Sequence, residues 1–91
     1  MTTFLMFGKY SREALKGISA ARTKKAETVI HKHGGKLVCA YALIGCHDLV
    51  LIVELPDVKE AMRTSMELTK LTGIGFTSSP ALCIAEFDEL A

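Results

Sequence analysis

Segments with strand and helix patterns follow one another along this chain in the order strand, helix, strand, strand, helix, strand. That order is typical of the split βαβ, or ferredoxin-like, fold. Right-handed crossovers then place the first and third strands in the middle of an antiparallel sheet and the others at its edges. The sequence therefore predicts an α+β fold, a four-stranded antiparallel sheet with two helices on one face. The expected strands are Phe4–Tyr10, Lys36–Leu43, Asp48–Glu54 and a stretch within Ala81–Phe87 that either begins there or begins earlier and is interrupted at Ser78, Ser79 and Pro80.

Two helices of ordinary length are predicted between these strands. The first covers about Ala20–His33 and ends at two glycines, Gly34 and Gly35, which suit the left-handed backbone of a helix end. Pro56 and Asp57 open the second, and Gly73 ends it. Ser11–Ile18 is expected to form a short helical turn. The residues expected to face inward are Arg22, Ala26, Val29, Ile30 and His33 on the first helix, and Val58, Ala61, Met62, Ser65, Leu68 and Thr69 on the second.

Length and composition favour one packed domain, residues 1–91. The chain is 49% hydrophobic and 23% charged, too apolar for a disordered segment. A net charge of +1 gives no reason to expect nucleic acid or an anionic membrane as a partner. No stretch approaches the roughly 20 apolar residues of a membrane-spanning helix, and the start lacks the pattern of a secretion signal. We therefore expect a cytoplasmic protein.

The strands are apolar on both of their faces. In Phe4–Phe7 and Leu49–Val53, adjacent residues that must point to opposite faces are all apolar, and the same is expected of the segment Ala81–Ala85. Two helices cover only one face of a four-stranded sheet. A bare apolar face of that size exceeds the patches that soluble monomers expose. We therefore expect a second copy to cover it, giving a homodimer or a larger homo-oligomer.

Three stretches of the chain are similar to those of a known family. GKYSREALKGI, GGKLVCAYALIG and IGCHDLVLIVELPD resemble the GYD domain family of small bacterial and archaeal proteins, within the dimeric α+β barrel group. Gly45 and Asp48 match the family's Gly and Asp, while His47 stands where the family usually has Tyr. The resemblance implies the ferredoxin-like barrel but no established activity. Its relatives include cofactor-free monooxygenases, lactone isomerases, haem-handling enzymes and regulatory proteins, and the fold does not choose among them.

Cys46, His47 and Asp48 stand side by side before the third strand and invite a thiol-catalytic interpretation. A catalytic Cys–His pair needs atoms about 2.6–3.2 Å apart, which neighbours in an extended strand do not provide. The alternative is a hairpin corner: Gly45 supplies the turn geometry and Asp48 accepts hydrogen bonds from turn N–H groups. His47 is then the member expected to touch a ligand.

Five residues are candidates for binding a small ligand: Lys9, Tyr10, Arg22, Tyr41 and His47. A phenol, two cations and a histidine around an apolar hollow would suit a small aromatic or enol-type anion. The alternative is that both tyrosines are core aromatics with exposed hydroxyls.

No metal, cofactor or disulfide is expected. His31 and His33 lie two apart on a helix and cannot share an ion. Cys39 and Cys83 fall inside predicted strands, and we expect both to be buried. Two functions remain open: a homodimeric small-ligand-binding or structural module, and a cofactor-independent monooxygenase or isomerase acting on a small organic acid or phenol. A cavity of about 300 Å³ with converging polar groups would distinguish the enzyme.

Overall fold

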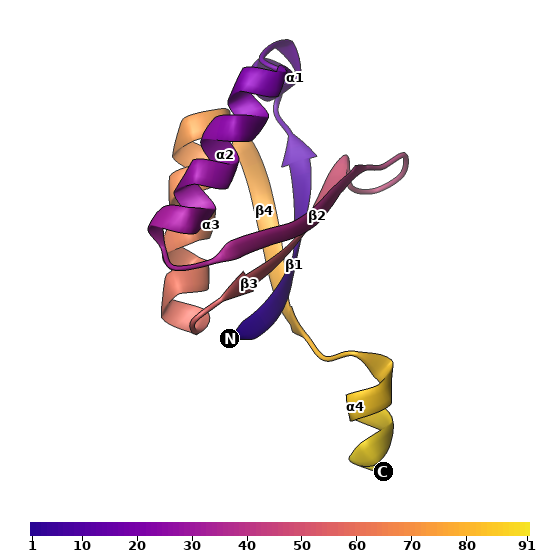
Figure 1. The fold of residues 1–91 in the computed structure, drawn as a ribbon. Helices are drawn as coiled ribbons and strands as arrows, with labels where there is room; N and C mark the ends of the chain where they lie inside the picture. Colours follow the sequence, from indigo (N-terminus) through magenta and orange to yellow (C-terminus); the bar gives the residue numbers. More distant parts are fainter.

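Four strands in one sheet and four helices make up the chain, and the computed structural model describes all of its residues, 1–91 (Figure 1). Two helices are long enough to pack along the sheet, and two are short. In chain order the elements are β1 (Thr2–Tyr10), α1 (Arg12–Lys16), α2 (Ala20–Lys32), β2 (Lys36–Ala42), β3 (Leu49–Leu55), α3 (Val58–Thr72), β4 (Ile74–Ala81) and α4 (Ile84–Glu89).

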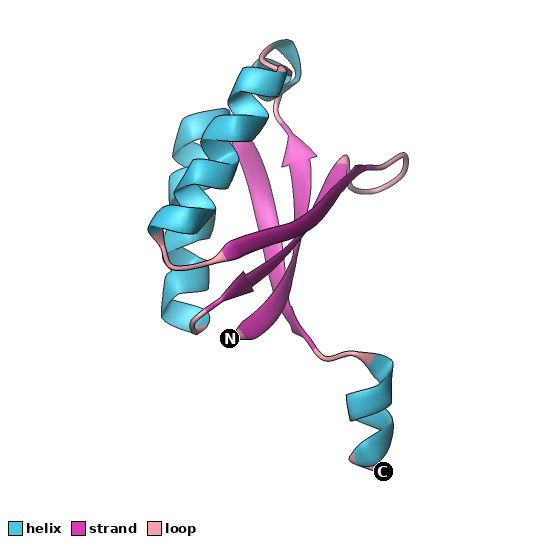
Figure 2. Cartoon of the chain, in the orientation of Figure 1, coloured by secondary structure: helices cyan, strands magenta, loops and turns pink.

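The strand order in the sheet is β2-β3-β1-β4, and every pair of neighbours is antiparallel. Both α2 and α3 lie on the same face of this sheet (Figure 2). The predicted ferredoxin-like fold is therefore confirmed, with β1 and β3 in the middle and β2 and β4 at the edges. Pro80 lies in the edge strand β4, where a missing N–H donor is tolerated.

The helices begin and end where local chemistry predicts. The Ser19 hydroxyl accepts a hydrogen bond from the first turn of α2, and the Asp57 carboxylate accepts one from the Glu60 N–H at 2.8 Å. Gly73 ends α3 with φ +76°, in the left-handed region that favours glycine.

The core lies between the sheet and α2 and α3. On α2 the predicted inward residues Val29 and Ile30 are buried. On α3 the prediction was partly wrong, because Val58 and Met62 are more than half exposed and Thr69 is exposed as well. The small side chains of Ala61 and Thr64 instead face the sheet and let α3 lie close to it. The row of α3 that contains Val58 and Met62 is therefore turned outward. The full set of buried apolar core residues is Phe4, Met6, Val29, Ile30, Leu51, Val53, Leu55, Ala61 and Leu68.

The fourth strand lies earlier in the chain than expected. Strand β4 starts at Ile74, directly after Gly73, and pairs with β1 through a stretch rich in serine and threonine. The segment expected to be a strand instead forms α4, since its apolar residues recur every three positions, as in a helix. Cys83 is consequently exposed at the N-cap of α4 rather than buried in a strand, and Cys39 is only half-buried.

One face of the sheet carries no helix (Figure 2). We call it the open face. Its apolar part comes from β1, β2 and β3, while β4 contributes only small side chains, Thr77, Ser79 and Ala81, so the expectation that all four strands are apolar there was wrong. The apolar residues of the open face, assigned from the strand register, are Leu5, Phe7, Cys39, Tyr41, Val50 and Ile52.

Candidate functional site

A small hollow between the sheet and α2 contains two of the candidate ligand-binding residues. Tyr10, at the end of β1, and Arg22, in the first turn of α2, both line this cavity of about 100 Å³. The Arg22 guanidinium lies 5.7 Å from the centre of the Tyr10 ring, which is cation–π distance, and it also donates a hydrogen bond to the Ala14 carbonyl oxygen. Arg22 therefore ties α1, α2 and β1 together at this end of the molecule.

The turn between β2 and β3 closes where the sequence predicts. The Leu43 N–H donates to the Asp48 carbonyl oxygen at 2.8 Å, which leaves residues 44–47 as the loop. Gly45 has φ +139°, a backbone conformation that residues other than glycine rarely adopt. Ile44, at the tip, is fully exposed.

The Asp48 side chain has a different partner from the one expected. Its carboxylate accepts a hydrogen bond from the Tyr10 backbone N–H at 2.7 Å, and no turn N–H reaches it. The Asp48 N–H in turn donates to the Gly8 carbonyl oxygen at 2.8 Å. The ladder between β1 and β3 ends at Gly8 and Leu49. The Asp48 side chain therefore continues the pairing of β1 and β3 beyond their last backbone hydrogen bond and holds the end of β1 in place.

The geometry does not assemble a Cys–His–Asp catalytic set. The Cys46 sulfur lies 3.8 Å from His47 Nδ1, at the outer limit for a contact with sulfur. The Asp48 carboxylate, which would have to orient the imidazole, is bonded to the Tyr10 N–H instead. The His47 ring packs against Phe7, with ring centroids 5.0 Å apart. His47 therefore extends the apolar surface of the open face.

The five candidate ligand-binding residues fall into two groups on opposite sides of the sheet. Tyr10 and Arg22 lie on the helix side, in the hollow described above. Lys9 and Tyr41 occupy open-face positions, and His47 joins them beside Phe7. The Lys9 ammonium donates to the Cys46 carbonyl oxygen at 3.3 Å, and Tyr41 is 60% exposed. The structure therefore places Lys9, Tyr41 and His47 on the open face, with Tyr41 two strands away from Lys9, and separates all three from Arg22.

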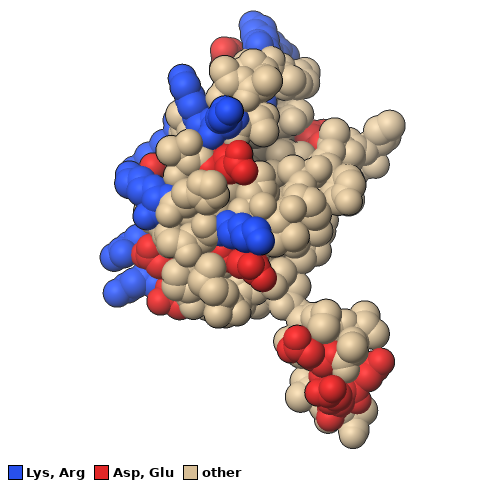
Figure 3. All heavy atoms as spheres, viewed as in Figure 1, with Lys and Arg blue, Asp and Glu red and all other residues tan.

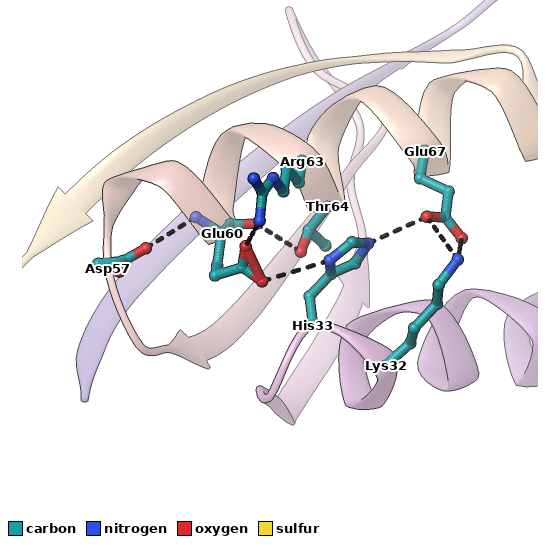
Figure 4. Close-up of polar contacts among 7 residues, drawn as sticks. All are labelled: Lys32, His33, Asp57, Glu60, Arg63, Thr64 and Glu67. Carbon is teal, nitrogen blue, oxygen red and sulfur yellow. Dashed lines mark hydrogen bonds and ion pairs between the residues drawn. The ribbon is translucent and has the colours of Figure 1, made fainter.

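An ion-pair cluster that the sequence analysis missed joins the end of α2 to α3 (Figure 4). His33 is its centre: Nε2 lies 3.0 Å from a Glu67 oxygen, and Nδ1 lies 3.4 Å from a Glu60 oxygen. Lys32 also contacts Glu67, and Arg63 contacts Glu60 at 2.7 Å. Only the imidazolium form offers two N–H donors to two carboxylates. The spacing of Glu60, Arg63 and Glu67 on one helix was the available signal, but nothing in the sequence placed His33 opposite them.

The cluster acts on the protonation of Glu67. The hydrogen bond from His33, followed by that from Lys32, lowers the pKa of the Glu67 carboxyl below the ordinary value of 4.5. The carboxylate is therefore held in its charged form, where it links the two helices.

A comparison with protein-family models decides the family. The model of the GYD domain matches residues 4–91, nearly the whole chain. The chain belongs to the GYD domain family. The resemblance noted from the sequence is therefore confirmed. No curated protein matches this GYD domain in sequence.

Solved structures share the fold of this GYD domain. One is the leucine response regulatory protein LrpA of Mycobacterium tuberculosis, with a TM-score of 0.60 and 8% identity over 90% of this chain. Another is an AsnC family transcriptional regulator from Agrobacterium tumefaciens, with a TM-score of 0.59 and 18% identity over 90% of this chain. The GYD domain spans about half of each regulator, 51% and 50% of their chains. Such low identities show a common fold alone.

Two further observations describe what the surface of the GYD domain offers. None of its helices has the length and apolar character needed to cross a membrane. Its largest cavity, about 430 Å³, lies between α3 and β4, and the polar side chains lining it are serines, Ser65 and Ser78. This cavity therefore lacks the acid–base groups that catalysis of proton transfer requires.

Proposed function

We propose that this GYD domain is a cytoplasmic, self-associating module in which two copies pack through their open faces. The observation that carries the proposal is the apolar surface that β1, β2 and β3 present on the side without helices. Burial of apolar surface is the main favourable term in protein association. A two-fold axis would place the same face of each copy against the other, so that one surface serves both partners.

Tyr41 supports this arrangement most directly. Its side chain lies at an open-face position opposite Val50 and is 60% exposed in the single chain. Tyrosine combines a large apolar ring with a polar tip and is enriched at protein interfaces. Leu5, Phe7 and Ile52 surround the same surface and are half-buried by their neighbours alone. A second copy would complete their burial.

A small ligand would bind at the hairpin end of this face. Lys9, Tyr41 and His47 supply a cation, a phenol and an imidazole beside the ring of Phe7. When the two faces meet, these groups would lie at the rim of the space between the sheets. A ligand of small aromatic or carboxylate character would suit this rim, since the walls are apolar and the polar groups are few.

The competing function, a cofactor-independent enzyme, has less support. Such an enzyme needs a cavity of about 300 Å³ with converging polar groups. The hollow at Tyr10 and Arg22 is about 100 Å³, and the Arg22 guanidinium there already bonds to the Ala14 carbonyl. A self-associating binding module therefore explains the apolar open face and the small size of this hollow better than an enzyme does.

The test is the mass in solution. Light scattering after size-exclusion chromatography should give at least twice the 9.9 kDa chain mass. Tyr41→Asp places a charge on the open face and should shift the protein to a smaller species. Ile18→Asp is the matched control, because Ile18 is 57% exposed but lies outside the sheet, and it should leave the mass unchanged. A wild-type monomer at micromolar concentration, or equal masses for Tyr41→Asp and wild type, would contradict the proposal.

A further inference from the structure

Helix α4 is an apolar segment without a partner. Its apolar side chains Ile84 and Phe87, and Leu90 just after it, recur every three residues and therefore share one side of the helix. They are 71%, 60% and 74% exposed. No residue of α4 is buried, and the helix projects away from the rest of the chain (Figure 1). A helix this short is not stable in water alone, so its apolar row requires a surface to pack against.

The chain also carries an apolar groove that nothing fills. It lies between α3 and β4 and has a volume of about 430 Å³. Val58, Met62 and Met66 recur every four residues along one side of α3 and form its outer wall, each more than half exposed. Ser78 and Pro80 of β4 are too small to fill the space from below. Exposed methionines adapt to different shapes, which suits a surface that receives a helix.

Helix α4 is acidic, and an unpaired cation lies at one end of the groove. Glu86, Asp88 and Glu89 make α4 acidic, and α4 has no basic residue; Figure 3 shows this red cluster separated from the blue side chains of the main body. Beside Met66, the adjoining hollow is lined by Arg63, Glu67 and Lys70 of α3 and by His33. Arg63 is already paired with Glu60, and Glu67 with His33 and Lys32, so Lys70 is the cation of this hollow without an ion pair. An acidic helix entering the groove with its carboxylates toward this end would bring them close to Lys70, which favours this pairing and its orientation.

The direction of α4 points to a groove on another molecule. Only Leu82 and Cys83 separate β4 from α4, and the Cys83 backbone is extended, with φ −66° and ψ 151°. This extended connection carries the helix away from the chain's own groove. Short connections of this kind favour exchange of a terminal element between copies.

We propose that α4 of one copy docks into the groove between α3 and β4 of a second copy, with Phe87 entering beside Met62 and Met66. This contact uses the helix side of the sheet, whereas the dimer proposed above uses the open face. One copy can therefore make both contacts at once, and the α4 contact would join dimers into larger assemblies. The two proposals rest on different residues, and either can fail without the other.

A disulfide trap tests the docking and its partner together. Phe87→Cys and Met66→Cys are combined in a background whose three native cysteines are replaced by alanine or serine. Mild oxidation should then produce covalently joined copies on a non-reducing gel. Phe87→Cys combined with Lys24→Cys, on the exposed side of α2, is the matched control and should remain single chains. A bond formed within one chain, detected by its altered mobility or by peptide mapping, would overturn the proposal in favour of the chain's own groove. Absence of any bond between the two positions would also overturn it.

A second measurement does not depend on introduced cysteines. Phe87→Asp should lower the mass found by light scattering, while the Tyr41→Asp variant still forms contacts through α4. Leu15→Asp is the control, because Leu15 is 57% exposed on α1, close to the 60% of Phe87. Circular dichroism establishes that each variant is folded. An unchanged mass for Phe87→Asp would contradict the docking of α4.

Discussion

Replacing Asp48 with alanine is expected to destabilise the fold measurably. The Asp48 carboxylate accepts the hydrogen bond of the Tyr10 N–H at 2.7 Å and replaces a backbone acceptor at the point where β1 leaves the sheet. In the Asp48→Ala variant this N–H has no protein acceptor. The end of β1 then keeps only two links to the β2–β3 turn, the Asp48 N–H bond to the Gly8 carbonyl oxygen and the Lys9 bond to the Cys46 carbonyl oxygen.

The magnitude follows from the kind of hydrogen bond and its exposure. A hydrogen bond to a charged group contributes about 1.5–3 kcal/mol to stability. Because this bond is only partly buried, we expect the lower end of that range, about 1.5 kcal/mol. For a domain of this size, that loss corresponds to a fall in Tm of about 6–12 °C.

Urea denaturation at a fixed protein concentration measures the change, since association would otherwise shift the midpoint. The midpoint should fall in Asp48→Ala with little change in the slope of the transition. Asp48→Asn retains an acceptor oxygen without the charge and should lie between the alanine variant and wild type. Cys46→Ser is the matched control in the same turn, because the Cys46 side chain is exposed, and should stay within about 0.5 kcal/mol of wild type. If Asp48→Ala is as stable as Cys46→Ser, the carboxylate does not anchor β1.

Three further predictions concern the core, the ion-pair cluster and a helix end. Leu68 is completely buried, so Leu68→Ala should cost about 2–5 kcal/mol in the free energy of unfolding, measured by the same denaturation. Contacts with His33 and Lys32 lower the pKa of Glu67, so wild type should be more stable than Glu67→Gln above pH 4.5. This difference in stability should disappear as the pH falls through the pKa that Glu67 has in the folded state. A constant difference from pH 7 to pH 2 would contradict the role of the carboxylate. Gly73→Ala forces alanine to φ +76° and should cost about 1–2 kcal/mol, seen as a lower Tm.

Most of the fold could be predicted because its signals are local. The apolar runs of β1 and β3, the Asp57 cap and the Gly73 stop depend on neighbouring residues in the chain. The fourth strand was misplaced because β4 is an edge strand whose serines and threonines carry little apolar pattern, and the more apolar segment after it is a helix. On α3, two rows of apolar residues fit a helix, one through Met62 and one through Ala61 and Leu68, and the sequence pattern alone does not decide which is buried.

Less of the site could be predicted, because its contacts join distant parts of the chain. Lys9 and Tyr10 are adjacent in sequence, yet strand alternation sends them to opposite sides of the sheet. Asp48 reaches Tyr10, and His33 reaches Glu67, only through the tertiary fold. Residue type alone suggested a single group of polar side chains, whereas the structure has two.

The central position of β1 has a consequence for folding during translation. Within this domain β1 is made before the other strands, yet it pairs with β3 and with β4, Phe4 lying opposite both Val53 and Pro80. Its apolar residues therefore have no strand partner until β3 has been made, and the sheet is complete only after β4 has followed. Such late, long-range pairing slows folding and leaves the growing chain open to aggregation. We therefore expect Phe4–Phe7 to be the segment most open to aggregation before β3 and β4 pair with it.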